Sequence, residues 1–342
     1  MRKCIVFFFL QVLLAEAMGQ ALTSENLLTL SAISKSKKID SYLRKNGFRP
    51  TGSAQINDTL VSTYILNKAG DSVNRSVSST IATKYSAIIY KTASKREYLE
   101  LIKTFRNNGF ICREPIDSLT VKPLLFQHHE YTVLTLPDTS TTADKEYALQ
   151  VQSISLPAPK DIRYADDLLV FSSHELLEYY FGKENIKSDV YYFSENQIAR
   201  CSVLFLNTRR QVVFIWQDEV NKCTINHLLF GGQMQLKSSR SNEQLVAENN
   251  WVFKSGIRPG MSLQELRKLH GNTFNFYGGN AALAGLVIAD STGRLDFKKE
   301  NVFLSCMNCN DGRFFSSPLI NADDAIADER VLFILSVSLS PG

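Results

Sequence analysis

The sequence lacks an apolar segment long enough to cross a membrane. Its N-terminal apolar run, from Ile5 to Leu14, falls well short of the roughly 20 residues that a transmembrane helix needs. A strong charge of one sign is also missing, because 38 Lys and Arg residues against 34 Asp and Glu residues leave a formal net charge of only +4. This balance gives no reason to expect nucleic acid or an acidic lipid surface as a partner. The hydrophobic fraction of 44% is that of a folded globular protein rather than a disordered one.

Several motifs of well-known enzyme chemistry are absent as well. The sequence contains no glycine-rich phosphate loop, no Gly-x-Ser-x-Gly nucleophile turn and no His-Glu-x-x-His zinc helix. We therefore predict no catalytic residue, no cofactor and no metal, and we favour a non-enzymatic protein. A hydrolase whose site is dispersed along the chain stays open as an alternative, because active-site residues converge only in space.

The N-terminus has the pattern of a secretory signal peptide. Arg2 and Lys3 precede the apolar run, and the small residues Ala17 and Gly19 follow it at the spacing of a cleavage site. We exclude residues 1–19 from the fold on this basis. The protein is expected to be exported, either secreted or periplasmic, and to have no transmembrane segment.

The first half of the chain contains a weak internal repeat. The segments YLRKNGF at 42–48 and TFRNNGF at 104–110 align, and each closes a predicted helix with Asn-Gly. The glycine is expected to adopt a positive φ, which ends the helix. Repeat units near 35–92 and 94–156 would each be a helix followed by strands. This order predicts an N-terminal α+β domain at 20–156 with antiparallel strand pairing.

The first of these helices is markedly basic. It carries Lys35, Lys37, Lys38, Arg44 and Lys45 within one short stretch. A solvated helix face is the favoured interpretation, since Lys and Arg are mostly exposed in folded proteins. A role in binding phosphate or the cell-envelope surface stays open.

A proline-containing polar linker at 157–165 separates the two predicted domains. The C-terminal domain, at 166–342, is also expected to be α+β, with helices packed on an antiparallel sheet. Two helices that start at a serine and end at a glycine suggest that it too contains duplicated units, near 166–232 and 251–342.

Three polar clusters have the residue types of functional sites. They are His128 to Glu130, Ser172 to Glu175, and the aspartates Asp323, Asp324 and Asp328. In an alternating strand the two histidines point in opposite directions, which argues against a metal site. Ser172 to Glu175 fit helix capping better than a catalytic triad, because neighbours at a helix start do not converge. The aspartates lack the pattern of a calcium loop and are expected at a solvated helix end.

Five cysteines follow the predicted cleavage site, and two of them flank a predicted hairpin. In an oxidising compartment Cys201 and Cys223 are expected to form a disulfide. One geometric objection applies. Two strand spacings amount to about 9.6 Å, whereas bridged Cα atoms are usually less than about 7 Å apart, so the bond needs a bulge or a connection that brings the cysteines closer.

The motif Cys306-Met-Asn-Cys309 allows three interpretations. A small structural disulfide or free thiols are favoured, because the motif follows a predicted strand and precedes a turn. A redox-active pair is typically found at a helix N-terminus, and a zinc site needs two further ligands. A thiol-disulfide oxidoreductase that uses Cys306 and Cys309 stays open as an alternative function. Cys112, after a helix-ending glycine, is expected in the core.

The best-specified stretch is Trp251 to Gly278. Ser262 and Glu265 form the Ser-x-x-Glu capping box that starts a helix, and Gly271 is placed to end it. A tight turn precedes this helix and a half-buried strand follows it.

The residues of this stretch carry a resemblance. Gly256 to Leu263, with Glu265-Leu266 and Leu269 to Gly271, resemble a unit in outer-membrane assembly lipoproteins of the BamE/SmpA type and in β-lactamase-inhibitor-like folds. With Asn275 to Gly278 added, the stretch is also similar to uncharacterised secreted proteins of the Bacteroidetes. The resemblance implies an α+β fold and a place in the bacterial envelope or outside the cell. It carries over no catalytic residue.

These observations lead to one functional hypothesis. We expect a secreted, non-enzymatic binding or scaffold protein of the cell envelope or exterior, whose partner is a protein. A concave sheet face with exposed aromatic side chains is the surface expected to hold that partner.

Overall fold

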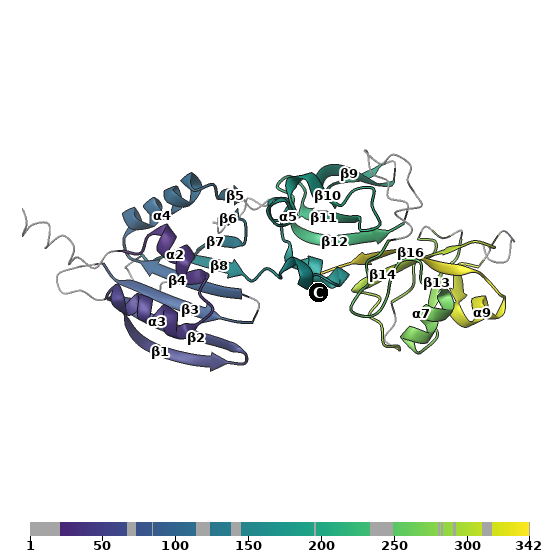
Figure 1. Ribbon diagram of the computed structural model, residues 1–342, viewed down its shortest axis with the longest axis horizontal. Coiled ribbons are helices and arrows are strands. Elements are labelled where there is room, and N and C mark those ends of the chain that lie inside the picture. The colour runs from purple at the N-terminus through teal and green to yellow at the C-terminus, as the bar shows by residue number, and fades with distance from the viewer. Residues whose placement is uncertain are drawn as a thin grey trace, which may run out of the picture. The chain divides into compact units, whose positions relative to one another are not determined.

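The computed structural model of the protein describes residues 21–66, 73–83, 85–113, 124–137, 145–194, 196–232, 249–279, 281, 283–289, 292–309 and 317–341. The fold is α+β, as predicted, with helices packed on antiparallel sheets (Figure 1). The chain divides into two compact units, Met1–Leu156 and Pro157–Gly342. Among the described residues, no helix has the length and apolar composition that crossing a bilayer requires. The predicted signal peptide, residues 1–19, lies outside the described residues.

The N-terminal unit is built on one eight-stranded antiparallel sheet, in the order β1-β2-β3-β4-β8-β7-β6-β5. Its strands are β1 Arg49–Ile56, β2 Thr59–Leu66, β3 Arg75–Ile81, β4 Tyr85–Thr92, β5 Ile111–Arg113, β6 Leu125–His128, β7 Tyr131–Leu136 and β8 Tyr147–Ile154. Its helices are α2 Ser24–Ser31, α3 Ser36–Lys45 and α4 Lys95–Asn107. Helix α3 precedes the run β1 to β4, and α4 precedes the run β5 to β8. The two runs meet where β4 pairs with β8. The sequence repeat itself stays a prediction.

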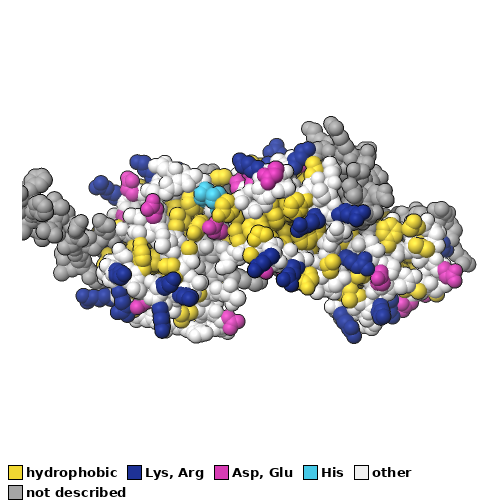
Figure 2. Space-filling model, viewed as in Figure 1, with side chains coloured by type: hydrophobic (Ala, Val, Ile, Leu, Met, Phe, Trp, Pro, Cys, Tyr) yellow, Lys and Arg dark blue, Asp and Glu magenta, His cyan; other side chains and the backbone are white. Residues whose placement is uncertain are grey.

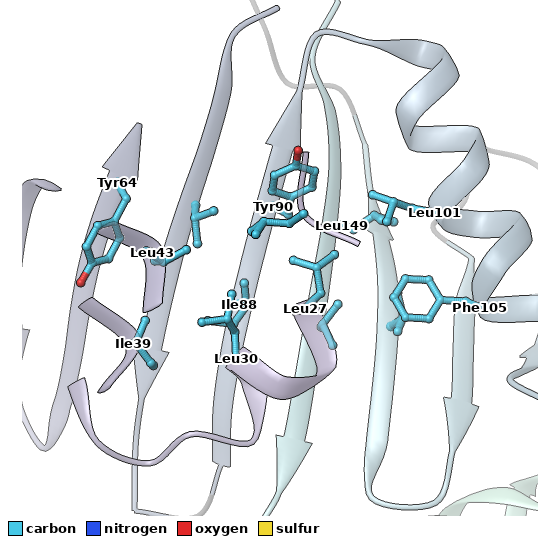
Figure 3. Packing of buried hydrophobic residues seen from close by; sticks show 14 of the residues in the cluster. Leu27, Leu30, Ile39, Leu43, Tyr64, Ile88, Tyr90, Leu101, Phe105 and Leu149 are labelled. Atoms are coloured by element: carbon cyan, nitrogen blue, oxygen red, sulfur yellow. The ribbon is translucent and has the colours of Figure 1, made fainter. Parts of the chain in front are cut away.

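The three helices pack on one face of this sheet (Figure 3). Apolar residues spaced three or four positions apart give each helix its buried side. These include Leu27 and Leu30 of α2, Ile39 and Leu43 of α3, and Leu101 and Phe105 of α4, which pack with Tyr64, Ile88, Tyr90 and Leu149 of the sheet. Gly47 and Gly109, with φ of +86° and +82°, follow the last turns of α3 and α4, as the Asn-Gly pattern predicts.

The C-terminal unit contains a six-stranded antiparallel sheet in the order β14-β16-β12-β11-β10-β9 and a two-stranded sheet, β13-β15. Its strands are β9 Ile186–Ser194, β10 Gln197–Leu204, β11 Val212–Asp218, β12 Cys223–Gly231, β13 Asn275–Tyr277, β14 Glu300–Cys306, β15 Leu319–Asn321 and β16 Leu332–Leu339. Its helices are α5 His174–Phe181, α7 Leu263–His270 and α9 Ala322–Ala327, with 3₁₀ turns η1 Pro159–Asp161, η2 Ala165–Val170 and η3 Lys183–Asn185.

The segment 285–288 joins these two sheets through backbone hydrogen bonds. On one side, the N–H of Gly285 donates to the carbonyl of Tyr277 in β13 at 2.9 Å. On the other side, the N–H of Leu304 in β14 donates to the carbonyl of Gly285 at 2.8 Å. The N–H of Val287 continues this ladder by donating to the carbonyl of Val302 at 2.9 Å. The segment therefore places β13 beside the end of β14.

Helix α7 has the capping geometry described for its sequence. The Oγ of Ser262 accepts a hydrogen bond from the N–H of Glu265 at 3.2 Å, and Oε2 of Glu265 accepts one from the N–H of Ser262 at 2.9 Å. These bonds with Ser262 lower the pKa of the Glu265 carboxyl. Gly271 ends the helix with a φ of +88°, and Leu263 and Leu266 face the core.

Helices α5 and α7 are followed by different strand arrangements. After α5, the strands β9 to β12 are neighbours in chain order. After α7, helix α9 interrupts the strands, and β16 lies between β14 and β12. The two segments share a capped helix but not the strand order that follows it. Their duplication stays a prediction.

Candidate functional site

Cys201 and Cys223 do not form the disulfide expected from the sequence. Cys201 pairs with Ile215 of β11, and Cys223 pairs with Asp218 at the far end of that strand. Strand β11 therefore separates the two cysteines, which is the geometric objection raised by a simple meander. Burial raises the pKa of the Cys201 thiol to about 12, with Asp189 as a further cause, so this thiol is an unreactive core residue.

Helix α5 holds a polar network that the sequence did not reveal. Nδ1 of His174 lies 2.8 Å from Oγ of Ser202, and Nε2 of His174 lies 3.4 Å from Oε1 of Glu178. The indole N–H of Trp216 donates to the same Ser202 oxygen at 2.9 Å. Burial lowers the pKa of His174, and the Lys222 ammonium lowers it further. A neutral His174 accepts a hydrogen bond from Ser202 and donates one to Glu178. With this tautomer, each side chain of the network has a hydrogen-bond partner.

This Ser-His-Glu chain has the residue types of a hydrolase triad but not its geometry. Ser202 is 0% exposed, so no substrate reaches its hydroxyl. The Trp216 indole already donates to that hydroxyl. The histidine nitrogen that faces the serine is Nδ1, whereas in a triad it is Nε2. We therefore interpret the network as structural. A serine between apolar neighbours in a strand, and the i, i+4 spacing of His174 and Glu178, are the only sequence signals for it.

The predicted cap of α5 is shifted by one residue. Ser173, not Ser172, occupies the N-cap, and its Oγ accepts from the N–H of Leu176 at 3.2 Å. The carbonyl of Ser172 instead accepts from the N–H of Thr224. Glu175 consequently lies in the first turn, where its negative charge interacts favourably with the helix dipole. Its side chain does not form the second hydrogen bond of a capping box.

The pair His128-His129 does not alternate as in a strand. His128 ends β6, and His129 lies in the turn before β7 with a φ of +50°. The two rings therefore stack, with their centroids 3.9 Å apart. Burial lowers the pKa of His128, and His129 lowers it further. In the described part of the chain, no three His, Cys, Asp or Glu side chains are placed to hold a metal ion together.

The aspartates of α9 lie at the start and the end of that helix. Asp323 forms a bidentate ion pair with Arg267 of α7, in which Nε of Arg267 lies 2.7 Å from Oδ1 of Asp323. The side-chain hydrogen bond from Arg267 lowers the pKa of the Asp323 carboxyl. Asp328 occupies the C-cap position. The pair joins α7 to α9.

The strongest candidate site surrounds the disulfide of Cys306 and Cys309, whose Cα atoms are 5.7 Å apart. The motif continues from the last residue of β14 into a turn. Beside it lies a cavity of about 250 Å³, which we call the disulfide pocket. Its walls include Tyr277, Ala284, Leu304, Cys306, Cys309 and Leu332. Of the described residues, no Asp, Glu, Lys, Arg or His contributes to these walls.

Asn308 anchors the turn of the disulfide to the segment before β16. Its Oδ1 accepts from the N–H of Val331 at 2.8 Å, and its Nδ2 donates to the carbonyl of Glu329 at 3.1 Å. The N–H of Met307 also donates to the carbonyl of Val331, at 3.0 Å. Held in this way, Cys309 is only 3% exposed while the side chain of Met307 is 73% exposed.

Gly285 is required at the opposite wall. Its φ is +83°, and a Cβ added there would lie 2.1 Å from the carbonyl oxygen of Leu304. Only a residue without a side chain allows this close approach of two backbones. Glycine at this position therefore fixes how near β13 and β14 come to each other, and so fixes the width of the pocket.

Four exposed apolar side chains belong to the segments that form the pocket. They are Leu283, Met307, Leu319 and Val331. Leu319 pairs with Tyr277 in the two-stranded sheet, and Val331 is hydrogen-bonded to Met307. Leu283 precedes the wall residues Ala284 and Gly285. Each of the four is thus a chain neighbour or a strand partner of a wall residue, and exposed apolar residues that occur together are typical of an interaction site.

Comparisons with known proteins provide no assignment for this site. The chain matches no family model, no curated protein and no solved structure. The resemblance to the BamE/SmpA type, to inhibitor-like folds and to Bacteroidetes proteins therefore stays a prediction. The geometry of the disulfide pocket is the basis for a functional proposal.

Proposed function

We propose that this chain is an exported, non-enzymatic binding protein that recognises another protein, and that the disulfide pocket holds an apolar side chain of that partner. The observation that carries the proposal is a cavity of about 250 Å³ whose wall residues have four exposed apolar residues as chain neighbours or strand partners. Small-molecule sites usually measure about 300–1,000 Å³, so this cavity is better matched to a side chain.

The lining supports binding over catalysis. Among its described wall residues there is no Asp, Glu, Lys, Arg or His, and the titratable or hydroxyl side chains are those of Tyr277 and Ser305 beside the disulfide. Its walls instead supply apolar contact from Leu304, Leu332 and the ring of Tyr277. Burying an apolar side chain there would contribute about 1.5–3 kcal/mol.

The pocket is also held in place before any partner arrives. The disulfide closes one wall, Asn308 fixes that wall to the chain before β16, and Gly285 fixes the other wall to β14. A site that is already ordered loses less conformational entropy on binding. A disulfide of this kind fits an oxidising compartment, which supports export.

Site-specific photo-crosslinking tests this proposal. A benzoylphenylalanine is placed at Met307 in the full chain, which is produced in the cells that export it. Val220, an apolar residue of the same unit that is 76% exposed, is the matched control position. We expect an adduct of one defined mass from position 307 and none from 220. Equal adducts from both positions, or none from either, would reject the proposal.

A variant adds a second readout. Met307→Asp places a charge at the rim of the pocket and should remove most of the adduct formed from a benzoylphenylalanine at Leu319. Val220→Asp introduces the same charge elsewhere and should leave that adduct unchanged. An unchanged adduct in Met307→Asp would show that the pocket rim does not contact the partner.

Thiol-disulfide exchange is a second candidate function, favoured by the unequal burial of the two sulfurs. Cys306 is partly exposed and Cys309 is buried, which is the arrangement of an attacked and a resolving cysteine. A partner thiolate would attack Sγ of Cys306, and the electron pair of the broken bond would leave with Sγ of Cys309. A second partner thiol would then attack the mixed disulfide at the partner sulfur. The products are an oxidised partner and a reduced Cys306-Cys309 pair.

The position of the motif weighs against this second function. Cys306 is the last residue of strand β14 and the next three residues form a turn, whereas the reactive cysteine of a redox pair usually lies at a helix N-terminus. Insulin reduction by the wild-type chain decides the question, and an inactive wild type rejects it. If it is active, Cys309→Ser should accumulate a mixed disulfide through Cys306, and Cys306→Ser should not.

A further inference from the structure

A separate surface with binding features lies in the N-terminal unit, along strand β1. This strand is the last in its sheet and pairs with β2, and no described strand pairs with its other edge. All eight of its residues are exposed. From Gly52 to Ile56, the pairing with β2 is regular, whereas Pro50 and a register shift interrupt it before Gly52. The free edge therefore offers a regular row of backbone groups over 52–56.

A groove runs between this strand and helix α3. Its volume is about 690 Å³, within the range of about 300–1,000 Å³ that is usual for ligand sites. The residues that line it include Ser36, Lys37 and Asp40 of α3, Thr51 and Ser53 of β1, and Tyr64 of β2. We call it the α3-β1 groove. Hydroxyl groups, one ammonium group and one carboxylate group lie among apolar surface that makes up more than half of this lining, so the groove suits a peptide rather than a purely polar ligand.

The surroundings of the groove are strongly basic. Between positions 35 and 49 there are six Lys or Arg residues and one acidic residue, a local net charge of +5 against +4 for the whole chain. The acidic residue, Asp40, is already paired with Arg44 at 2.8 Å. Among the described residues, Lys35, Lys37 and Lys38 are exposed and have no ion-pair partner. Figure 2 shows Lys and Arg side chains gathered over the region of α3, with few acidic ones between them.

We propose that the free edge of β1 binds an extended acidic segment of a partner protein by strand addition. The backbone of that segment pairs with Gly52 to Ile56 and continues the sheet. Side chains of a strand point alternately to its two faces, so every second residue of the segment faces the side of the sheet that carries α3. Acidic residues at those alternate positions meet the unpaired lysines of α3. The proposed ligand is thus defined by acidic residues at every second position as well as by its negative charge.

The strand edge favours a peptide over nucleic acid as the ligand. A row of backbone N–H and C=O groups is matched by another peptide backbone. Single-stranded nucleic acid is usually held by aromatic side chains on which the bases stack. Tyr64 is the one aromatic residue that lines the groove within the described chain, and it is buried. The surface therefore supplies strand pairing and charge, and it supplies no stacking platform.

Peptide binding to the full chain tests the proposal by fluorescence anisotropy. The probe is a fluorescein-labelled Thr-Glu-Thr-Glu-Thr-Glu peptide. Its first control is Thr-Thr-Thr-Glu-Glu-Glu, which has the same composition and charge without the alternation. Its second control replaces the central threonine of the alternating peptide by proline, which removes a backbone N–H. We expect the alternating peptide to bind at least about threefold more tightly than either control.

Charge-reversal variants test the role of α3. In the triple variant Lys35→Glu, Lys37→Glu and Lys38→Glu, the affinity for the alternating peptide should fall about tenfold, which corresponds to roughly 0.5 kcal/mol for each lysine. The matched control reverses Lys95, Arg96 and Lys103 of α4, which are also exposed and give the same change in net charge. This control should change the affinity less than twofold.

Three results would overturn the proposal. Equal affinity for the alternating peptide and for Thr-Thr-Thr-Glu-Glu-Glu would show that the interaction is unspecific charge attraction. Equal weakening by the α3 and α4 variants would show that net charge, not this surface, controls binding. Sedimentation that shows a dimer of the chain, lost when Ala54→Lys adds a charge to β1, would identify a second copy as the occupant of the edge.

Discussion

Replacing Gly285 by alanine should destabilise the C-terminal unit through one close contact. The added Cβ would lie 2.1 Å from the carbonyl oxygen of Leu304, whereas contacts of this kind need more than about 3 Å. The segment must therefore move away from β14 by about 1 Å. That movement breaks the hydrogen bond from the N–H of Leu304 to Gly285 and strains the one from the N–H of Gly285 to Tyr277.

The magnitude follows from these contacts. A non-glycine residue in the left-handed region costs about 1–2 kcal/mol, and each lost hydrogen bond costs about 0.5–1.5 kcal/mol. Together they predict a loss of about 2–5 kcal/mol in the free energy of unfolding. Gly260 provides a matched control, because its φ of +80° is similar but no atom lies within 4 Å of an added Cβ. Gly260→Ala should therefore cost only the backbone part, about 1–2 kcal/mol.

Urea unfolding followed by tryptophan fluorescence measures this difference directly. Both tryptophans, Trp216 and Trp251, belong to the C-terminal unit, so the signal reports on that unit. For a urea m-value of about 2 kcal/mol per molar, the additional 1–3 kcal/mol in Gly285→Ala lowers its midpoint by about 0.5–1.5 M below that of Gly260→Ala. If the two variants unfold at the same midpoint, the steric reasoning for the pocket wall is wrong.

Two further predictions concern the buried polar groups of the same unit. Ser202→Ala leaves the indole N–H of Trp216 without its acceptor. The free energy of unfolding, measured by urea titration, should therefore fall by about 1–3 kcal/mol. A change below about 0.5 kcal/mol would contradict this prediction. Burial lowers the pKa of His174 and of His227, so the unfolded chain binds protons more tightly than the folded one. The two histidines make their full contribution to the free energy of unfolding above about pH 6.5, the pKa of histidine in the unfolded chain. This contribution is lost as the pH falls toward the lower pKa values of the folded state. The thermal midpoint should therefore drop between pH 8 and pH 5, and less so in His174→Gln/His227→Gln; a midpoint that rises on acidification would contradict the sign.

Local sequence signals predicted local structure well. The capping pattern at Ser262 and Glu265 and the glycines at positions 47, 109 and 271 act within one or two helical turns, where the residue type alone determines the backbone conformation. The antiparallel α+β class also followed from short helices and β-rich runs without long crossover helices.

Contacts between distant segments were not predictable in this way. The bond between Cys201 and Cys223 was expected from hairpin spacing, but sheet register placed β11 between them. The Ser202-His174 contact joins a strand to a helix 28 positions away, and no periodicity signals it. The disulfide pocket likewise depends on β13, the segment 285–288 and β14, which are separate in the chain. The cysteine motif was visible in the sequence, whereas the cavity beside it was not.

The place of β16 in its sheet has a consequence for how the protein forms during synthesis. This strand pairs with β12 through Leu228 and Leu339, and with β14 through Val302 and Val337. A ribosome delivers it after the other described strands, so one edge of β12 and one edge of β14 stay unpaired until β16 emerges. Pairings between residues so far apart in the chain form slowly. Chaperones that shield nascent apolar surface should therefore meet this half of the molecule for longer than the N-terminal half.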